Sequence, residues 1–258
     1  MIMEVRDLSY RYGNGRMIFQ DVNFSIDKGE TITILGPNGA GKSTLFNCIA
    51  NHFKPTSGEI LLDGKPMKTM KLVDVAKKVG YVPQIHTPAY AFTVQDFVVM
   101  GRTPHMGMLS QPKKEDYARV AEVLDQLEIG HLAEQPYTQI SGGERQKVTI
   151  ARVLVQEPEM ILLDEPTAHL DYGNQWRVIS LVKELTKRDF AIIMTTHMPD
   201  HAISLGGRVG ILDNDGRLQF GETDDILTAE TLSQVYNTEL KMVYIEEIER
   251  NTCVAAIQ

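Results

Sequence analysis

Short apolar runs separated by polar turns dominate the first 35 residues of the chain. Gly13-Asn14-Gly15 and Asp27-Lys28-Gly29 are typical turn sequences, so residues 2–35 predict β hairpins. Within this stretch, the β-branched run from Thr31 to Leu35 predicts a buried strand. Other apolar runs bounded by turn residues predict further strands over 59–63, 79–82, 160–163, 191–195 and 240–246.

Helical periodicity marks the middle of the chain. Apolar residues recur at intervals near 3.6 over 93–101 and 113–128, which predicts two helices. A third helix is expected to start near Gly143 and to run to about Gln156. Further helices are expected over 43–50, 173–188 and 225–236.

The alternation of strands and helices predicts an α/β fold with a parallel-sheet core. An antiparallel β subdomain is expected at the N-terminus, and a mostly helical subdomain is expected as an insertion at about 88–156. The whole chain, 1–258, is predicted to form one domain. Its parts are the core with the β subdomain (1–87 and 157–221), the helical subdomain (88–156) and a C-terminal helix and strand extension (222–258).

Composition narrows the class of protein. The 258 residues carry a formal net charge of −8 without a basic cluster, so we expect no nucleic-acid partner. Cys48 and Cys253 match no disulfide or metal spacing, which favours a reducing cytosol. The N-terminus lacks the apolar run of a signal peptide, and no stretch approaches the roughly 18 apolar residues of a membrane helix. We therefore expect any membrane role to come through a partner.

A phosphate-binding loop follows the strand predicted at Thr31 to Leu35. The segment Gly36-Pro37-Asn38-Gly39-Ala40-Gly41-Lys42-Ser43 fits G-x-x-x-x-G-K-[ST] at every fixed position and leads into a predicted helix. The glycines allow backbone N–H groups to surround a β-phosphate, and the helix dipole favours the anion. Lys42 supplies a positive charge to the β and γ oxygens, and Ser43 supplies a hydroxyl ligand for Mg²⁺.

Two carboxylates end the apolar run from Met160 to Leu163. Asp164 is placed to hold Mg²⁺, directly or through water, and Glu165 is placed to polarise the attacking water as a general base. Solvated acids often end a strand, so this pair by itself is weak evidence. Together with the phosphate loop it indicates ATP hydrolysis, because one site needs both parts.

The segment Ile140-Ser141-Gly142-Gly143-Glu144 precedes the acidic pair and resembles the ABC signature Leu-Ser-Gly-Gly-Gln. On this segment, and on the order of the motifs around it, the chain is identified as a member of the ABC ATPase family. The resemblance implies a P-loop NTPase fold of the RecA-like type that uses ATP and Mg²⁺. Serine and glycines at a helix start are by themselves typical of an ordinary N-cap.

The same resemblance assigns the site residues. It makes Gln84 the glutamine of the Q-loop, His197 the switch histidine and Tyr12 the aromatic residue that stacks on adenine. It implies catalytic roles for Glu165, His197 and Gln84, and metal ligation by Ser43, Gln84 and Asp164. The implied nucleotide-binding residues are Tyr12, Gly36, Pro37, Asn38, Gly39, Ala40, Gly41, Lys42, Ser43, Thr44, Ser141, Gly142 and Gly143.

Two positions depart from the family pattern. Glu144 stands in place of glutamine, and we expect its carboxylate to reach the ribose hydroxyls or solvent rather than the γ-phosphate. His169 stands where serine is common in the D-loop segment Ala168-His169-Leu170-Asp171, so its role across a dimer stays open.

The resemblance also implies the partners. In this family, two copies form a head-to-tail dimer in which the signature of one copy covers the ATP held by the other. The segment Thr93 to His105 and the segment His197 to Ala202 are similar to importers of metal chelates, which include siderophore, haem, vitamin B12 and molybdate transporters. This implies transmembrane permease subunits, an extracytoplasmic substrate-binding protein and a peripheral position at the cytoplasmic face of the membrane.

Two other function classes compete with the importer subunit. An iron–sulfur cluster assembly ATPase is also a single ABC domain and stays open as the alternative. A nucleotide-binding module without hydrolysis is disfavoured, because Glu165 and His197 are both present.

Overall fold

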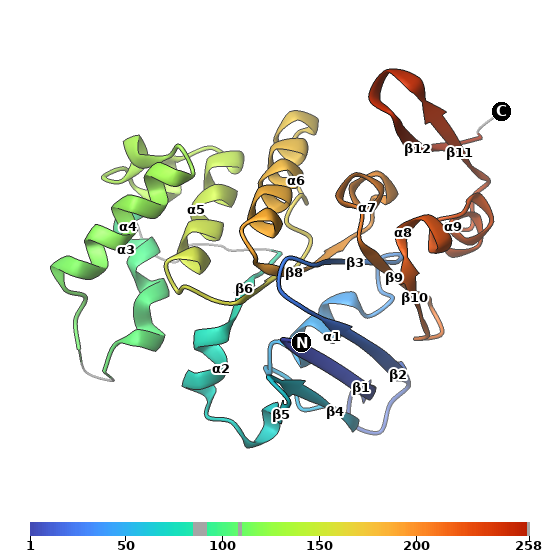
Figure 1. Ribbon diagram of the computed structural model, residues 1–258, viewed down its shortest axis with the longest axis horizontal. Coiled ribbons are helices and arrows are strands. Elements are labelled where there is room, and N and C mark those ends of the chain that lie inside the picture. The colour runs from blue at the N-terminus through green and yellow to red at the C-terminus, as the bar shows by residue number, and fades with distance from the viewer. Residues whose placement is uncertain (85–91, 108–109, 257–258) are drawn as a thin grey trace. The chain divides into compact units, whose positions relative to one another are not determined.

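The computed structural model describes residues 1–84, 92–107 and 110–256 (Figure 1). The chain forms two compact units, the first of Met1–Met70 with Ile179–Gln258 and the second of Lys71–Val178. Residue 88, the predicted start of the helical insertion, and the last two residues of the predicted C-terminal extension lie outside the described residues.

The elements of the first unit alternate between strands and short helices. Its strands are β1 (Met3–Arg11), β2 (Met17–Ile26), β3 (Thr31–Leu35), β4 (Ser57–Leu62), β5 (Lys65–Pro66), β8 (Ala191–Thr196), β9 (Arg208–Leu212), β10 (Leu218–Glu222), β11 (Leu240–Ile245) and β12 (Arg250–Ala255). Its helices are α1 (Lys42–Ile49), η1 (Met67–Thr69), α7 (Pro199–Leu205), α8 (Thr223–Ile226), α9 (Ala229–Tyr236) and η5 (Glu246–Ile248).

The second unit is mainly helical, with two strands. The strands are β6 (Val79–Val82) and β7 (Met160–Leu163). The helices are α2 (Leu72–Lys78), α3 (Val94–Val99), η2 (Met100–His105), α4 (Lys114–Gln126), η3 (Gly130–Leu132), η4 (Tyr137–Gln139) and α5 (Gly142–Leu154), and α6 (Tyr172–Lys187) runs from this unit into the first. No helix in the described part of the chain is long and apolar enough to cross a membrane.

An antiparallel sheet forms the N-terminal part of the first unit, as predicted. Its order is β2-β1-β4-β5, and the turn at Gly13 joins β1 to β2 as a hairpin. The second predicted hairpin is wrong, because β3 pairs in parallel with β8 and β9 instead. All five residues of β3 are buried, which suits a central strand of a parallel sheet covered on both faces.

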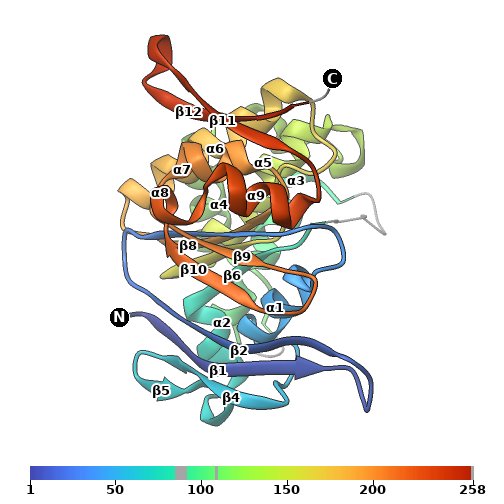
Figure 2. The ribbon, with the colours of Figure 1, turned by 90° about the vertical axis from the view of Figure 1, so that its right-hand side faces the viewer.

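The parallel-sheet core predicted from the sequence is confirmed. In the first unit, β3 lies between β8 and β9, and β10 pairs antiparallel with β9. Helix α1 lies on one face of these strands, between them and the antiparallel sheet, and α7, α8 and α9 lie on the other face (Figures 1 and 2). In the second unit, β6 pairs in parallel with β7. Parallel pairing brings the carboxyl ends of neighbouring strands to one edge, where residues that follow the strands meet.

The C-terminal region differs from the sequence prediction in two ways. The single helix predicted over 225–236 is two helices, because α8 ends at Ile226 and the side chain of Thr228 caps α9 by accepting the N–H of Thr231 at 3.1 Å. The strand after it, β11, pairs with β12, which the sequence patterns did not predict. Strand β12 is half exposed and short, so its apolar periodicity is weak.

Candidate active site

The phosphate-loop segment leaves the carboxyl end of β3 and enters α1 directly, as the motif requires. The turn inside it is closed by the N–H of Ala40, which donates to the carbonyl of Pro37 at 3.3 Å. Gly41 has a φ of 102°, and a Cβ there would lie 2.5 Å from Cγ2 of Ile18. Only glycine satisfies both conditions, so this position of the loop is fixed by backbone geometry and by packing.

The side chain of Lys42 lies folded under the loop. The residue is 4% exposed, and its Nζ donates hydrogen bonds to the carbonyls of Gly36 at 2.8 Å and Pro37 at 3.1 Å. A buried ammonium is stable only when its protons have acceptors, and the loop carbonyls supply two of them. The charge of Lys42 is therefore held inside the curve of the loop, where a bound phosphate would meet it.

Tyr12 projects from an aromatic cluster next to the loop. Its ring is 52% exposed and makes edge contacts with Tyr10, at a centroid distance of 5.0 Å, and with Phe53, at 6.1 Å. Its hydroxyl lies 3.2 Å from Oγ1 of Thr44 in α1. An exposed, rigidly supported ring beside a phosphate loop is a platform on which a nucleobase can stack. Sequence reasoning did not identify Tyr10 or Phe53, because Phe53 reaches this cluster only through the fold.

His197 follows the carboxyl end of β8, the strand that neighbours β3. The register pairs Leu35 with Thr196, so the phosphate loop and His197 leave adjacent strand ends. His197 is exposed, whereas Thr196 and His201 behind it are buried. Oγ1 of Thr196 accepts the N–H of Met198 at 3.1 Å and lies 3.2 Å from Nδ1 of His201. The structure thus brings His197 to the same edge as the loop.

Burial, and secondarily the neighbouring His197, lowers the pKa of His201 from 6.5 to about 4. His201 is therefore neutral in the folded protein, whereas the unfolded chain binds a proton below pH 6.5. We expect the contribution of neutral His201 to the free energy of unfolding to be fully present above pH 6.5. As the pH falls from 6.5 to 4, the free energy of unfolding should decrease by on the order of 1 kcal/mol per pH unit. Urea unfolding at pH 7, 6 and 5 measures this slope.

A His201→Gln variant is the control for this slope, since its side chain can still bond to Thr196 but does not titrate. The difference between the two proteins isolates His201 from the carboxylates that titrate in the same range. Equal pH slopes for both proteins would contradict the assignment.

In the second unit, parallel pairing of β6 and β7 brings Gln84 and the two acids together. The register pairs Val82 with Leu163, and the N–H of Asp164 donates to the carbonyl of Val82 at 2.9 Å. Nε2 of Gln84 then donates to Oε2 of Glu165 at 3.0 Å. Glu165 has a φ of 43°, a left-handed conformation that is costly for a residue with a Cβ and is typical of functional sites.

Asp164 is 3% exposed, and its Oδ2 accepts the hydroxyl of Tyr81 at 3.3 Å. Burial, and secondarily the Asp164 carboxylate, raises the pKa of Tyr81, which therefore stays protonated as a donor. Tyr81 is a further residue that the sequence analysis did not single out, although it lies in the same segment as Gln84.

The predicted metal ligands fit Mg²⁺ by their chemistry. Ser43, Gln84 and Asp164 offer a hydroxyl, an amide and a carboxylate oxygen, which are the hard ligands that this ion prefers. The Gln84 amide group bonds to Glu165 through its nitrogen, which leaves its oxygen for a cation. Within the described residues, no group of three or more His, Cys, Asp or Glu side chains could hold a metal by itself.

The signature segment opens helix α5, with Ser141 as its N-cap. Ser141 and Glu144 form a capping box. Oε2 of Glu144 accepts the N–H of Ser141 at 2.8 Å and its hydroxyl at 2.7 Å, and the N–H of Glu144 donates to Oγ of Ser141 at 3.4 Å. The side chain of Glu144 is thus turned back on Ser141, a capping role that the sequence analysis did not predict. Hydrogen bonding to Ser141 is also the main reason that the pKa of Glu144 is lowered.

Gly143 has a packing role beside its place in the signature. A Cβ at this position would lie 2.6 Å from Oδ1 of Asn174 in α6. Asn174 in turn donates to Asp171 through its backbone N–H at 2.8 Å and its side chain at 2.6 Å. His169, in the same connection, is exposed and has a φ of 63°. The starts of α5 and α6 are therefore held close together in the second unit.

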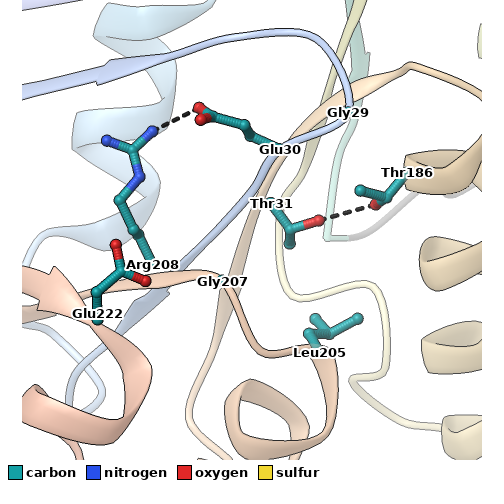
Figure 3. A pocket seen from close by; sticks show the side chains of 8 residues that line it. All are labelled: Gly29, Glu30, Thr31, Thr186, Leu205, Gly207, Arg208 and Glu222. Atoms are coloured by element: carbon teal, nitrogen blue, oxygen red, sulfur yellow. Dashed lines mark hydrogen bonds and ion pairs between the residues drawn. The ribbon is translucent and has the colours of Figure 1, made fainter.

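A separate pocket lies at the opposite end of β3. It has a volume of about 310 Å³ and is bounded by Gly29, Glu30 and Thr31 at the start of the strand (Figure 3). An ion pair of 2.6 Å between Arg208 and Glu30 occupies one side. None of the predicted site residues lines this pocket, and the loop at the other end of β3 stays the candidate site.

Comparison with known proteins identifies the family. The sequence profile of the ABC transporter family matches residues 19–168 of the chain. The molybdate import ATP-binding protein MolC of Haemophilus influenzae is 36% identical over 236 residues, covering 91% of this chain and 88% of that protein.

Solved structures agree with this family. The chain is similar, with a TM-score of 0.89 and 32% identity, to an inward-facing metal-chelate type ABC transporter, covering 100% of this chain and 98% of that chain. It is also similar, with a TM-score of 0.73 and 27% identity, to a dimeric ATP-binding cassette in a post-hydrolysis state bound to ADP and Pi, covering 86% of this chain and 99% of that chain.

The phosphate loop, the signature helix and the acidic strand end follow one another along the chain in this order, and each lies on the element that the sequence predicted. The family match extends over more than half of the chain, and the similarity to MolC covers nearly all of it. The chain belongs to the ABC transporter family, as one of its ATP-binding subunits with an ABC-type ATPase activity.

Proposed function

We propose that this chain powers an importer of a metal chelate or a related oxyanion or macrocyclic ligand, as a dimer bound to permease subunits at the cytoplasmic face of the membrane. The cargo class is supported by the similarity to the molybdate import protein and to the metal-chelate type transporter. A substrate-binding protein outside the membrane would deliver the ligand. The non-transport alternative, an iron–sulfur assembly ATPase, is not favoured by these relatives.

The observation that carries the proposal is the 3.0 Å hydrogen bond between Gln84 and Glu165. Glu165 is the proposed general base, and Gln84 follows β6 in the same unit as helices α3, α4 and α5. In this proposal, a permease helix that docks on these helices moves Gln84 and, through this bond, alters the position of the Glu165 carboxylate. This is a direct mechanical path from a membrane partner to the chemistry.

The proposed chemistry is an in-line attack of water on the γ-phosphate. The loop of residues 36–43 and Lys42 bind the β- and γ-phosphates, and Tyr12 stacks on the base. Glu165 accepts a proton from the attacking water, and His197 bonds the γ-phosphate from the end of β8. Bound Mg²⁺, held by Ser43 and Asp164 with Gln84, would neutralise charge on the phosphate oxygens.

The proposed working unit is a head-to-tail pair. One chain offers an anion site at the loop and a second at the start of α5, where Gly142 and Gly143 supply the first helix N–H groups and Ser141 is the N-cap. In the pair, the second site of each copy covers the γ-phosphate held by the other. Hydroxyl donation from Ser141 to that phosphate requires release of the hydrogen bond to Glu144.

Reconstitution with its permease tests the importer function. We expect the chain to copurify with a polytopic membrane protein encoded for the same transporter, and its ATP hydrolysis to rise when a loaded binding protein is added to the complex in lipid vesicles. The unloaded binding protein is the control. An ATPase rate that is indifferent to both permease and loaded binding protein would exclude the importer and favour the iron–sulfur alternative.

A further inference from the structure

The C-terminal part of the chain touches the switch histidine. The hydroxyl of Tyr236, the last residue of α9, donates to the backbone carbonyl oxygen of His197 at 3.0 Å. The two residues are 39 positions apart. Tyr236 and His197 both lie after residues 19–168, the part of the chain that the family profile matches.

The backbone around His197 is already held on both of its sides. Before it, Thr196 is fully buried at the end of β8, and its Oγ1 accepts the N–H of Met198. After it, His201 is 1% exposed and lies against the same oxygen. The bond from Tyr236 holds the carbonyl of His197 itself, in the peptide unit that follows the Cα from which the imidazole projects.

Strand β12 holds the next helix in the same way. Oδ1 of Asp200, in the first turn of α7, accepts the hydroxyl of Thr252 at 2.7 Å and the N–H of Cys253 at 3.1 Å. Strand β11, the partner of β12, is tied to α9 because the N–H of Leu240 donates to Oγ of Ser233 at 2.9 Å. Helix α9 and the β11–β12 hairpin therefore act on the His197 connection as one attached piece, which we call the C-terminal clamp (residues 229–255).

The C-terminal clamp packs on core residues next to the start of the phosphate loop. Leu232 of α9 is fully buried in a cluster with Leu35, Val209 and Ile211, and Tyr236 packs against this cluster. Leu35 is the residue immediately before the phosphate loop. Tyr236 thus packs against the same cluster of side chains that contains Leu35 at the end of β3.

We propose that Tyr236 is a positioning residue for ATP hydrolysis, which holds the backbone of His197 so that the imidazole meets the γ-phosphate. This inference rests on the proposed role of His197. The C-terminal clamp holds the hydrogen bond between Tyr236 and His197 in place. Tyr236 contacts the histidine directly, and β12 contacts Asp200 in the helix that follows it. A displacement of about 1 Å at a reacting group can lower a rate by about a hundredfold, so the loss of one fixing bond is expected to have a smaller but clear effect.

The test begins with Tyr236→Phe in the full chain, which removes the hydroxyl and keeps the ring. We expect kcat for ATP to fall roughly tenfold, KM for ATP to stay within about twofold and the Tm to change little. Tyr244→Phe, the same change on the exposed face of β11, is the matched control and should keep the normal rate.

Asp200 provides a rescue pair. Asp200→Ala removes the oxygen that accepts from β12 and should lower kcat, whereas Asp200→Asn retains an acceptor oxygen and should restore most of the lost rate. An equal loss in both variants would show that the charge of Asp200 matters rather than the clamp, and would overturn its part in the proposal.

A double-variant cycle tests whether Tyr236 acts through His197. If Tyr236 acts through His197, then Tyr236→Phe should not lower the residual rate of His197→Ala any further. An additive loss, or a normal rate for Tyr236→Phe while His197→Ala is impaired, would overturn the inference alone. A normal rate for His197→Ala would overturn the proposed role of His197, and the inference with it.

Discussion

Replacement of Glu165 by glutamine should abolish most ATP hydrolysis while ATP binding is retained. The amide cannot accept the proton of the attacking water, and a general base contributes typically 10²–10⁴ in rate, or about 3–5 kcal/mol of barrier. Glu165 follows β7 and bonds to Gln84, whereas the phosphate loop follows β3. The substitution therefore changes no residue of the loop. The measurement is the ATPase rate of the purified protein, beside its affinity for a fluorescent ATP analogue.

Glu128→Gln is the matched control for this experiment. Glu128 is an exposed glutamate with a left-handed φ of 59°, close to the conformation of Glu165, but it lies among the helices after α4. The same chemical change in the same backbone conformation should leave the rate unchanged. A normal rate for Glu165→Gln would show that another group activates the water.

Ser141→Arg and Lys42→Ala should each be inactive alone and should recover activity together. Ser141→Arg blocks the start of α5 by bulk and puts a competing cation where the γ-phosphate of the partner would bind, while its own loop is intact. Lys42→Ala weakens nucleotide binding at its own loop and keeps an intact signature. In a mixed pair, one composite site carries both lesions and the other carries neither.

Mixing the two variants at equal amounts therefore restores roughly a quarter of the normal rate, because half of the pairs are mixed and each has one intact site. Melting curves of both variants check that they fold, since the loss of a serine cap alone costs only about 1 kcal/mol. Full activity of Ser141→Arg by itself would show that the signature of a second copy is not needed. Absence of recovery in the mixture, with both variants folded, would contradict independent composite sites.

Local sequence patterns predicted the parts of the site in which neighbouring residues interact. The phosphate loop depends on glycines at fixed spacing and on a strand and helix that flank it directly, so residues 36–43 could be recognised before the fold was known. The buried strand that ends in Asp164 and Glu165 was evident for the same reason. The turn of Glu144 back to Ser141 was not predicted, although serine followed three residues later by glutamate is a capping-box pattern.

Patterns within one segment could not predict strand partners. The run from Thr31 to Leu35 is a strand in any interpretation, but its parallel pairing with β8 depends on residues more than 150 positions away. The turn before it suggested a hairpin, and the burial of both its faces decided against one. The β11–β12 hairpin was partly missed because a short, half-exposed strand lacks a strong apolar period.

The sequence by itself determined which chemical groups this protein has, because phosphate binding and helix capping are set by a few adjacent residues. Only the tertiary structure decided what supports those groups. Tyr236 bonds to the carbonyl of His197, and Thr252 of β12 bonds to Asp200. Both bonds join segments that are far apart in the sequence and share no sequence pattern. They exist because α9 buries Leu232 in the core beside Leu35, and burial of apolar area depends on the whole chain and is not recorded in any one segment.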